Sequence, residues 1–327
     1  MNYPQVTILI PIRNVAKYIG ACLDALMSQT YPADKYEVWL LDNHSDDGTL
    51  EIAKKYSANR VKVIQIGAHS PPIKYNKVLP QITSEIIGFV DGDANVDRDW
   101  LRLVVEALED PKVAGASGLI LTENKGNLMA RIIGYELQDR YERMPKEITR
   151  VATMHVVYKK AVLEEIGGFN ESLKTGYDGE VGYRIKRAGY KIINILEAKV
   201  WHNHRATLWG FFKQQYEYGK FAIIRYLKIP KMMKGDEVTS FWMISQPLFY
   251  LAALIFLLMH LIFKTSIWLI FAPLIILLAS YIYSAVRISL KYRDITAMFL
   301  IVIYIIRVWG WSLGATMAIP SLFKSKK

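Results

Sequence analysis

The sequence predicts an α/β protein with a doubly wound, mainly parallel sheet, followed by an interfacial amphipathic helix and C-terminal transmembrane helices. Short β-branched segments alternate with helical segments over the first two hundred residues, which is typical of strands joined by crossover helices. Three long apolar stretches follow in the last third of the chain. Only eight basic and three acidic residues fall among the 93 residues after Lys234, so this part is poor in charge.

Composition excludes several classes of protein. With 327 residues, 52% of them hydrophobic, the chain is not disordered. A single cysteine, Cys22, excludes an internal disulfide and a cysteine-based zinc site, so a metal must be bound by oxygen or histidine ligands. The net charge of +11 is modest and much of it flanks the apolar stretches, so we expect no nucleic-acid partner.

The N-terminal elements are predicted in order. Residues 6–10 form a β-branched strand that ends at Pro11, and residues 16–29 carry apolar side chains at helical spacing. The pattern then repeats, with strands predicted over residues 37–41, 61–66 and 86–90, a turn over 45–48 and a helix over 50–56. This alternation predicts a parallel sheet, in which ligands bind beyond the carboxyl ends of the strands.

Carboxylates stand at these strand ends. Asp42 closes the second predicted strand, and Asp91 and Asp93 flank Gly92 directly after the strand over residues 86–90. Two carboxylates around one glycine form a site of oxygen ligands suited to Mg²⁺ or Mn²⁺. The alternative is a solvated acidic turn that caps a helix over residues 100–108. Neither GxGxxG after the first strand nor GxxxxGK[ST] occurs, which argues against a dinucleotide fingerprint or a P-loop.

Several segments together resemble family 2 glycosyltransferases of the GT-A fold, in particular membrane-anchored transferases of the exopolysaccharide or lipid-linked sugar type. They match in order and spacing over about the first 205 residues, and we expect a catalytic domain over residues 1–206. The segments are VTILIPIRN at 6–14, LMSQTYP at 26–32, LDNHSDDGT at 41–49, FVDGD at 89–93, GGFNE at 167–171, YDGEVGYR at 177–184 and AGY at 188–190.

The resemblance implies a nucleotide-sugar site. Asp42 would accept a hydrogen bond from the base of the donor, and Asp91 would face ribose or diphosphate. The residues that would line the nucleotide pocket are Pro11, Arg13 and Asn76.

The resemblance also implies a metal and diphosphate site. Asp93, together with Asp91, would hold the divalent cation, which neutralises charge on the departing nucleoside diphosphate. His202 would contact the metal or the diphosphate, and Arg205 would clamp phosphate with its planar fork. For His202 and the neighbouring His204 the alternative is a purely structural role.

Asp178 is the candidate catalytic base. It resembles the Asp of the family's Glu-Asp pair, with Tyr177 standing where the family has Glu. A carboxylate in reach of an acceptor hydroxyl removes its proton during attack on the anomeric carbon, and a single displacement inverts configuration. The alternatives are that Asp178 only caps the helix over residues 179–188, or that Glu180 is the base.

A basic, aromatic-rich amphipathic segment covers residues 207–228, within a linker region of 207–234. Such a helix just before membrane spans is typical of an interfacial helix, which favours a lipid-linked acceptor such as a polyprenyl phosphate or polyprenyl-diphosphate saccharide. The alternative is a helix packed on the soluble domain. Processive polysaccharide synthases carry Gln-x-x-Arg-Trp near this point, whereas Gln214 is followed by Gln-Tyr-Glu-Tyr, so we favour single transfer.

The transmembrane region is predicted over residues 235–327, with spans near 241–263, 267–286 and 295–319. Basic residues precede the first span and lie between the second and third, so the positive-inside rule predicts a protein of the cell membrane with a cytoplasmic catalytic domain. Lys324, Lys326 and Lys327 oppose this bias if all three segments cross, and a re-entrant last segment is the alternative. In that segment Arg307, Gly310 and Gly314 indicate packing against other helices of the chain.

The leading hypothesis is therefore an inverting, metal-dependent glycosyltransferase that uses a UDP- or GDP-sugar and a membrane lipid-linked acceptor. A processive polysaccharide synthase and a non-catalytic nucleotide-binding membrane scaffold are the alternatives. A transporter is disfavoured, because the apolar segments contain only one charge, Arg307.

Overall fold

The computed structural model describes residues 3–58, 60–68 and 70–324, and it divides into two compact units. The first unit comprises Met1–Glu123 and Arg140–Asn203, and the second comprises Asn124–Asp139 and His204–Lys327. Each unit consists of two segments that are separated in the sequence, because the chain passes from the first unit to the second, returns, and passes to the second again.

The first unit is built on one mixed sheet, which contains nine strands within the described residues. Parallel pairing joins β3, β2, β1 and β4, as predicted, and also β6 to β9, whereas β8, β5 and β7 pair antiparallel to their neighbours. The path along the sheet is β3 (Val61–Gln65), β2 (Tyr36–Asp42), β1 (Val6–Ile12), β4 (Ile86–Val90), β8 (His155–Lys159), β6 (Val113–Thr122), β9 (Lys191–His202) and β5 (Ala94–Val96), with β7 (Glu147–Ile148) beside β9.

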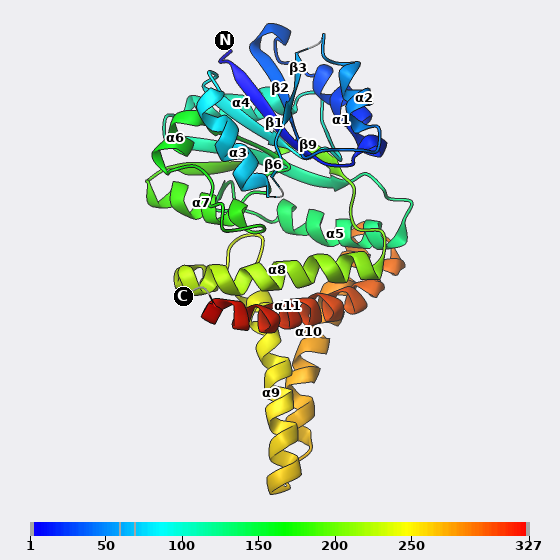
Figure 1. Ribbon diagram of the computed structural model, residues 1–327. Helices are drawn as coiled ribbons and strands as arrows, with labels where there is room; N and C mark the ends of the chain where they lie inside the picture. Colours follow the sequence, from blue (N-terminus) through cyan, green and yellow to red (C-terminus); the bar gives the residue numbers. More distant parts are fainter. Residues whose placement is uncertain (1–2, 59, 69, 325–327) are drawn as a thin grey trace. The chain divides into compact units, whose positions relative to one another are not determined.

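Continuous apolar sequence explains the central strands. All five residues of β4 and six of the seven of β1 are buried, as expected for parallel strands covered on both faces. Helices and 3₁₀ turns connect the strands (Figure 1): α1 (Ala16–Met27), η1 (Ala33–Lys35), α2 (Thr49–Lys54), α3 (Pro71–Val78), η2 (Leu79–Gln81), α4 (Trp100–Glu106), η3 (Ala107–Glu109), α6 (Lys160–Glu165) and α7 (Tyr177–Arg187). The doubly wound α/β class is thus confirmed, and α3 is a helix that the sequence analysis did not predict.

The register of the sheet gathers the predicted site. Ile12 at the end of β1 is level with Asp42 at the end of β2, and β1 also pairs with β4 up to Phe89. Because the three strands are parallel, the segments that follow them emerge at one edge of the sheet.

The second unit consists of long helices. They are α5 (Leu128–Glu142, in this unit up to Asp139), α8 (Leu208–Lys228), α9 (Phe241–Phe263), α10 (Trp268–Tyr292) and α11 (Leu300–Lys324), with the 3₁₀ turns η4 (Pro230–Lys234) and η5 (Ile295–Phe299). Within the described part of the chain, three helices are long and apolar enough to cross a membrane: Phe241–Phe263, Trp268–Tyr292 and Ile295–Pro320. They coincide with the three predicted spans.

The long helices of the second unit have two directions. Helices α9 and α10 form an antiparallel hairpin, whereas α8 and α11 lie side by side and run crosswise to it (Figure 1). Gly310 and Gly314 of α11 face α8, so the glycine spacing does serve packing within the chain, as the sequence indicated. Of the predicted tail lysines, Lys326 and Lys327 lie outside the described residues.

Candidate active site

The acidic turn after β4 is held in a tight space. A Cβ on Gly92 would lie 3.1 Å from Ile12 Cγ2 and 3.4 Å from Val15 Cγ2, so glycine lets the turn pack against the end of β1. Three residues of β5 follow at once and pair with β9, Ala94 opposite His202. This pairing brings His202 Nε2 to 3.3 Å from Asp93 Oδ1.

The structure thereby assembles the predicted metal ligands. One ligand atom each from Asp91, Asp93 and His202 lies within 4.8 Å of the others, and no second group of three potential His, Cys, Asp or Glu ligands occurs among the described residues. Two carboxylates and an imidazole fit a divalent cation that accepts both oxygen and nitrogen. Asn203 Nδ2 donates to the backbone oxygen of Asp93 at 3.2 Å and steadies the turn.

Electrostatics at this turn favour a cation. The pKa of Asp91 is raised to about 6, mainly by burial and then by the charges of Asp93 and Asp178, while His202 opposes the rise. Carboxylates that repel one another in a buried place are relieved by a bound positive charge. The same observation places Asp178 close enough to act on Asp91.

Asp178 lies in the first turn of α7, just after Gly176, whose φ of 73° only glycine adopts readily. Its Oδ1 accepts from the Gly179 nitrogen at 2.8 Å, and its Oδ2 lies 3.8 Å from Arg150 Nε. The helix begins at Tyr177 rather than at Gly179, and its N-cap is Gly176 without a side-chain cap, so Asp178 is not the capping residue of the alternative prediction. The Asp178 side chain is 18% exposed, so its carboxylate can bond the first turn of the helix and still reach a substrate.

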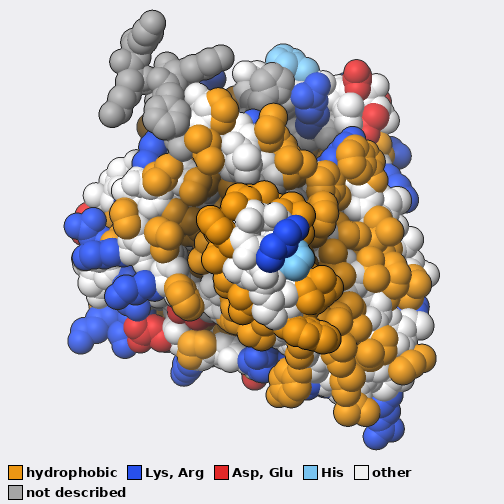
Figure 2. Space-filling model, turned by 90° about the horizontal axis from the view of Figure 1, so that it is seen from below, with side chains coloured by type: hydrophobic (Ala, Val, Ile, Leu, Met, Phe, Trp, Pro, Cys, Tyr) orange, Lys and Arg blue, Asp and Glu red, His pale blue; other side chains and the backbone are white. Residues whose placement is uncertain are grey.

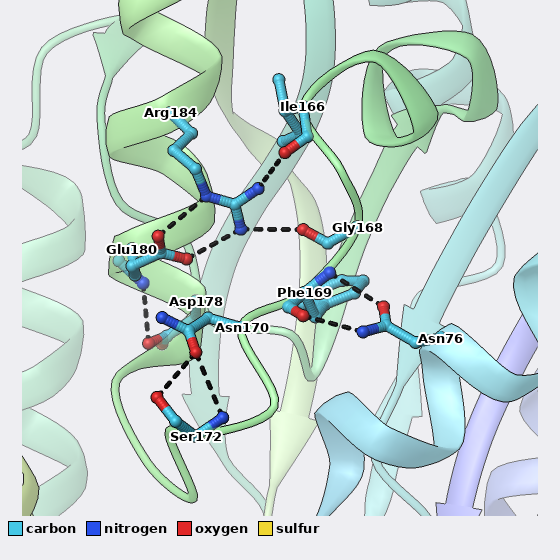
Figure 3. Close-up of polar contacts among 10 residues, drawn as sticks. Asn76, Ile166, Gly168, Phe169, Asn170, Ser172, Asp178, Glu180 and Arg184 are labelled. Carbon is cyan, nitrogen blue, oxygen red and sulfur yellow. Dashed lines mark hydrogen bonds and ion pairs between the residues drawn. The ribbon is translucent and has the colours of Figure 1, made fainter.

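Glu180, the alternative base, is engaged elsewhere. Both its carboxylate oxygens accept from Arg184, at 2.8 and 2.7 Å, and its side chain is buried (Figure 3). Arg184 also donates to the backbone oxygens of Ile166 and Gly168. The pair therefore ties α7 to the turn at Gly167 and Gly168, which is a structural role.

Asn76 has a similar task. Its Nδ2 donates to the Phe169 oxygen and its Oδ1 accepts from the Phe169 nitrogen, both at 2.8 Å (Figure 3). Nδ2 also donates to Glu171 Oε1 at 3.0 Å. A Cβ on Gly168 would lie 2.7 Å from Asn76 Oδ1, so the contact requires glycine there. The carboxamide holds the Gly168–Phe169 segment, and a direct contact with the donor stays a prediction.

The structure is closed around Asp42, the residue predicted to contact the nucleotide base. This residue is fully buried, and its carboxylate accepts from the nitrogen and the hydroxyl of Ser45. A nucleotide base could reach the carboxylate only if the Ser45 turn moved. Pro11 lies one residue before this level on β1, beside Leu41.

Lys74 of α3 is a buried neighbour that sequence reasoning missed. Its Nζ donates to the backbone oxygens of Ile12 and Leu41, at 3.2 and 2.9 Å. The pKa of Lys74 is lowered to about 8, mainly by burial and in part by the charge of Arg13, while Asp42 opposes the shift; Arg13 therefore lies near the same strand ends. No spacing in the sequence marks Lys74, because a lysine in a short polar helix is usually exposed.

Comparison with known proteins decides the family. A sequence model described as "Glycosyltransferase like family 2" matches residues 4–216. The chain belongs to glycosyltransferase family 2. The match includes every segment of the first unit described above, so the acidic turn and α7 lie inside the conserved domain of this glycosyltransferase.

Curated relatives of the glycosyltransferase are proteins of the same class. Glycosyltransferase AglE of Haloferax volcanii is 30% identical over 226 residues, 67% of this chain and 73% of the relative. A β-monoglucosyldiacylglycerol synthase of Synechocystis sp. is 28% identical over 236 residues, 69% of this chain but only 49% of the relative. A third relative, from Methanococcus voltae, is named dolichyl N-acetyl-α-D-glucosaminyl phosphate 3-β-D-2,3-diacetamido-2,3-dideoxy-β-D-glucuronosyltransferase. It is 25% identical over 234 residues, which are 67% of this chain and 72% of the relative.

A solved structure supports the GT-A fold of the glycosyltransferase. The mannosyltransferase PcManGT from Pyrobaculum calidifontis, in complex with GDP-Man and Mn²⁺, matches with a TM-score of 0.64 at 18% identity. The match covers 100% of this chain and 89% of that one. At this identity the likeness establishes the fold, which was the expectation from the sequence.

The candidate site of the glycosyltransferase contains residues that the sequence did not single out. Arg150 lies beside Asp178, and Thr153 Oγ1 bonds the Tyr177 hydroxyl at 3.0 Å. Both stand in an irregular segment between β7 and β8, where no periodic pattern could have marked them. Arg205, a predicted phosphate clamp, belongs to the second unit and its role stays a prediction.

Proposed function

We propose that this glycosyltransferase moves a single sugar from a nucleoside-diphosphate sugar to a membrane lipid-linked acceptor, with inversion and with a divalent cation. One observation carries the proposal: Asp91, Asp93 and His202 converge at the edge of the sheet with Asp178 close enough to influence Asp91. A cation site and a separate carboxylate are what a displacement at an anomeric carbon needs.

Each side chain has a part in the proposed reaction. Asp178 accepts the proton of the acceptor hydroxyl while that oxygen forms its bond to the anomeric carbon and the bond from that carbon to the diphosphate breaks. Asp91, Asp93 and His202 would hold Mn²⁺ or Mg²⁺, which would supply positive charge to the departing diphosphate. Pro11, Arg13, Asp42 and Asn76 are proposed to line the nucleotide pocket, with Arg205 as a phosphate contact.

Support for the donor and cofactor comes from the neighbours. The structure with GDP-Man and Mn²⁺ shares the fold of the chain over its whole length, which supports a nucleotide-sugar donor and favours Mn²⁺. The imidazole of His202 also favours Mn²⁺ over Mg²⁺, because Mg²⁺ strongly prefers oxygen ligands.

Support for the acceptor comes from the relatives and from the helices. One relative is named for a diacylglycerol product and another for a dolichyl phosphate acceptor, so the class of membrane lipids is common to both. The helices long and apolar enough to cross a membrane support a membrane location for this chain as well. Among lipids we propose a polyprenyl phosphate or polyprenyl-diphosphate saccharide.

We also propose that the catalytic domain, predicted over residues 1–206, faces the cytoplasm. Lys228, Lys231 and Lys234 precede α9, and Arg287, Lys291 and Arg293 follow the middle of α10, whereas the turn between these helices carries Lys264 alone. This distribution matches the positive-inside rule.

The proposal is tested with the purified full-length protein in detergent. Radiolabelled UDP- and GDP-sugars are offered with and without a polyprenyl phosphate, in Mn²⁺, in Mg²⁺ and in EDTA. We expect transfer to lipid from one donor with Mn²⁺ and none in EDTA. A folded protein that neither binds nor turns over any nucleotide sugar would instead be a non-catalytic scaffold.

A further inference from the structure

Helices α8 and α11 touch backbone to backbone. A Cβ on Gly310 of α11 would lie 2.8 Å from Gln215 Cβ and 3.1 Å from the Tyr216 nitrogen, and a Cβ on Gly314 would lie 2.9 Å from the Lys220 nitrogen. Trp311 Nε1 donates to Gln215 Oε1 at 2.9 Å. The residue numbers of the contacts increase along α8 as they increase along α11. The two helices therefore run side by side in the same direction, as Figure 1 shows.

Helix α8 is too polar to cross a bilayer. Its 21 residues include five charged side chains, spread from end to end: Lys213, Glu217, Lys220, Arg225 and Lys228. A charged residue at the centre of a membrane helix strongly disfavours insertion. Because α11 follows α8 closely over the same length, the two helices share one inclination to the membrane. A helix that accompanies α8 therefore does not cross either, although its own composition would allow it.

Ion pairs to α5 hold α11 close to the end of α10, and the pair made by α11 is buried. On α5, the carboxylate of Glu136 accepts from Arg307 of α11 at 3.0 and 3.2 Å, with both side chains 7% exposed. One turn later Asp139 accepts from Arg287 and Lys291, in the last turns of α10, at 2.6 to 3.0 Å. The first third of α11 and the end of α10 thus contact neighbouring residues of one helix.

An exposed apolar stripe runs along the other side of α11. Five side chains three or four residues apart are between 36% and 62% exposed: Val302, Ile305, Trp309, Leu313 and Met317. On α8, Trp209 is 63% exposed. Figure 2, which looks along the α9–α10 hairpin, shows hydrophobic side chains gathered around it. An apolar surface continuous with apolar helices fits acyl chains, and tryptophan favours the headgroup boundary.

We propose that α11 lies in the membrane interface beside α8, with its apolar stripe in the lipid, and that the chain crosses the membrane twice, through α9 and α10. This arrangement returns the end of α11 to the side from which α9 enters. It also removes the conflict between the C-terminal lysines and the positive-inside rule. The proposal does not depend on the reaction that the enzyme performs.

Spin-label depth measurements distinguish two crossings from three. Single cysteines replace Ile305, Leu313 or Met317 on α11, and Ile255 near the middle of α9, in full-length protein in phosphatidylcholine–phosphatidylglycerol vesicles. The parent protein, whose Cys22 is buried, gives the labelling background. Ile305 and Met317 are 12 positions apart on one helix, which corresponds to about 18 Å of helical rise.

We expect the three α11 labels to report the same shallow depth and the Ile255 label to report the bilayer centre. If Leu313 lay as deep as Ile255, with Ile305 and Met317 near opposite surfaces, α11 would cross and the proposal would be overturned. Labels on α11 that are reached by aqueous reagents but not by lipid-soluble ones would overturn it as well.

Epitope tags give a second readout that needs no substitution in a helix. Tags are placed at the N-terminus, in the turn at Thr265 and at the C-terminus, and protease protection is measured in sealed vesicles. Two crossings predict that the terminal tags share one side and that the turn lies on the other. Terminal tags on opposite sides, or a turn tag on the side of both ends, would refute the topology.

Discussion

Replacing Gly314 by alanine tests how closely α8 and α11 are packed. The new Cβ would lie 2.9 Å from the Lys220 nitrogen and closer still to the Tyr216 oxygen, whereas ordinary contacts begin at 3.4 Å. Both obstacles are backbone atoms in the middle of a helix, so no side chain can turn away. The helices must therefore separate by at least about 0.5 Å, which loosens every contact between them.

The magnitude follows from two opposing effects. Overpacking of this kind costs about 1–3 kcal/mol, and backbone obstacles place Gly314→Ala at the upper end. Alanine in a helix is favoured over glycine by about 1 kcal/mol, which offsets part of the cost. We expect a net loss of about 2 kcal/mol and a melting temperature lower by about 4–8 °C in detergent.

The control is Thr316→Ala, on the exposed side of the same helix, which should change the melting temperature by less than about 1 °C. Gly314→Ala with unchanged or higher stability would refute the close approach of the two backbones. It would then show only the propensity gain that alanine brings to any free helix.

The remaining predictions concern the first unit. Asp178→Asn should lower kcat by about 10²- to 10⁴-fold while donor affinity stays near normal, with Asp34→Asn as an exposed control, and equal turnover would eliminate Asp178 as the base. Asp93→Ala should weaken Mn²⁺ binding in titration calorimetry, and EDTA should abolish turnover of the wild type; an unchanged metal affinity would refute the ligand assignment. Burial lowers the pKa of His155 from 6.5 to about 4, so protons bind the unfolded chain first and stability falls as pH drops through this range. The loss is about 3 kcal/mol when complete, and His155→Gln should flatten the dependence of melting temperature on pH between 7 and 4.5; parallel profiles would exclude His155 as the cause.

Much of the first unit could be predicted because its signals are local. The strands ending near Pro11, Asp42 and Asp91 are apolar segments with clear ends, and parallel pairing alone brings those ends together. The group of Asp91, Asp93 and His202 depends on one further feature, the three-residue strand β5, whose pairing with β9 brings His202 beside the acidic turn. That strand is too short to leave a periodic pattern, and only the resemblance to a family indicated its result.

The second unit was less accessible. The sequence marked Arg307 and the glycines for packing, yet it gave no partner, because Glu136 and Asp139 lie in a charged segment that resembles an ordinary surface helix. Hydropathy likewise reports that α11 could cross a membrane and not how it is inclined. The direction of a helix depends on contacts with distant segments, here with α8 and α5.

Tyr177 has a consequence for the charge of the candidate site. Its ring packs against Tyr75 and Phe169, and burial raises the pKa of its phenol, so this position stays neutral at every physiological pH. A glutamate there would add a further anion beside three aspartates. Because the aromatic residue carries no charge, it adds nothing to the repulsion among these carboxylates. An arriving diphosphate therefore meets less negative charge than it would beside a glutamate.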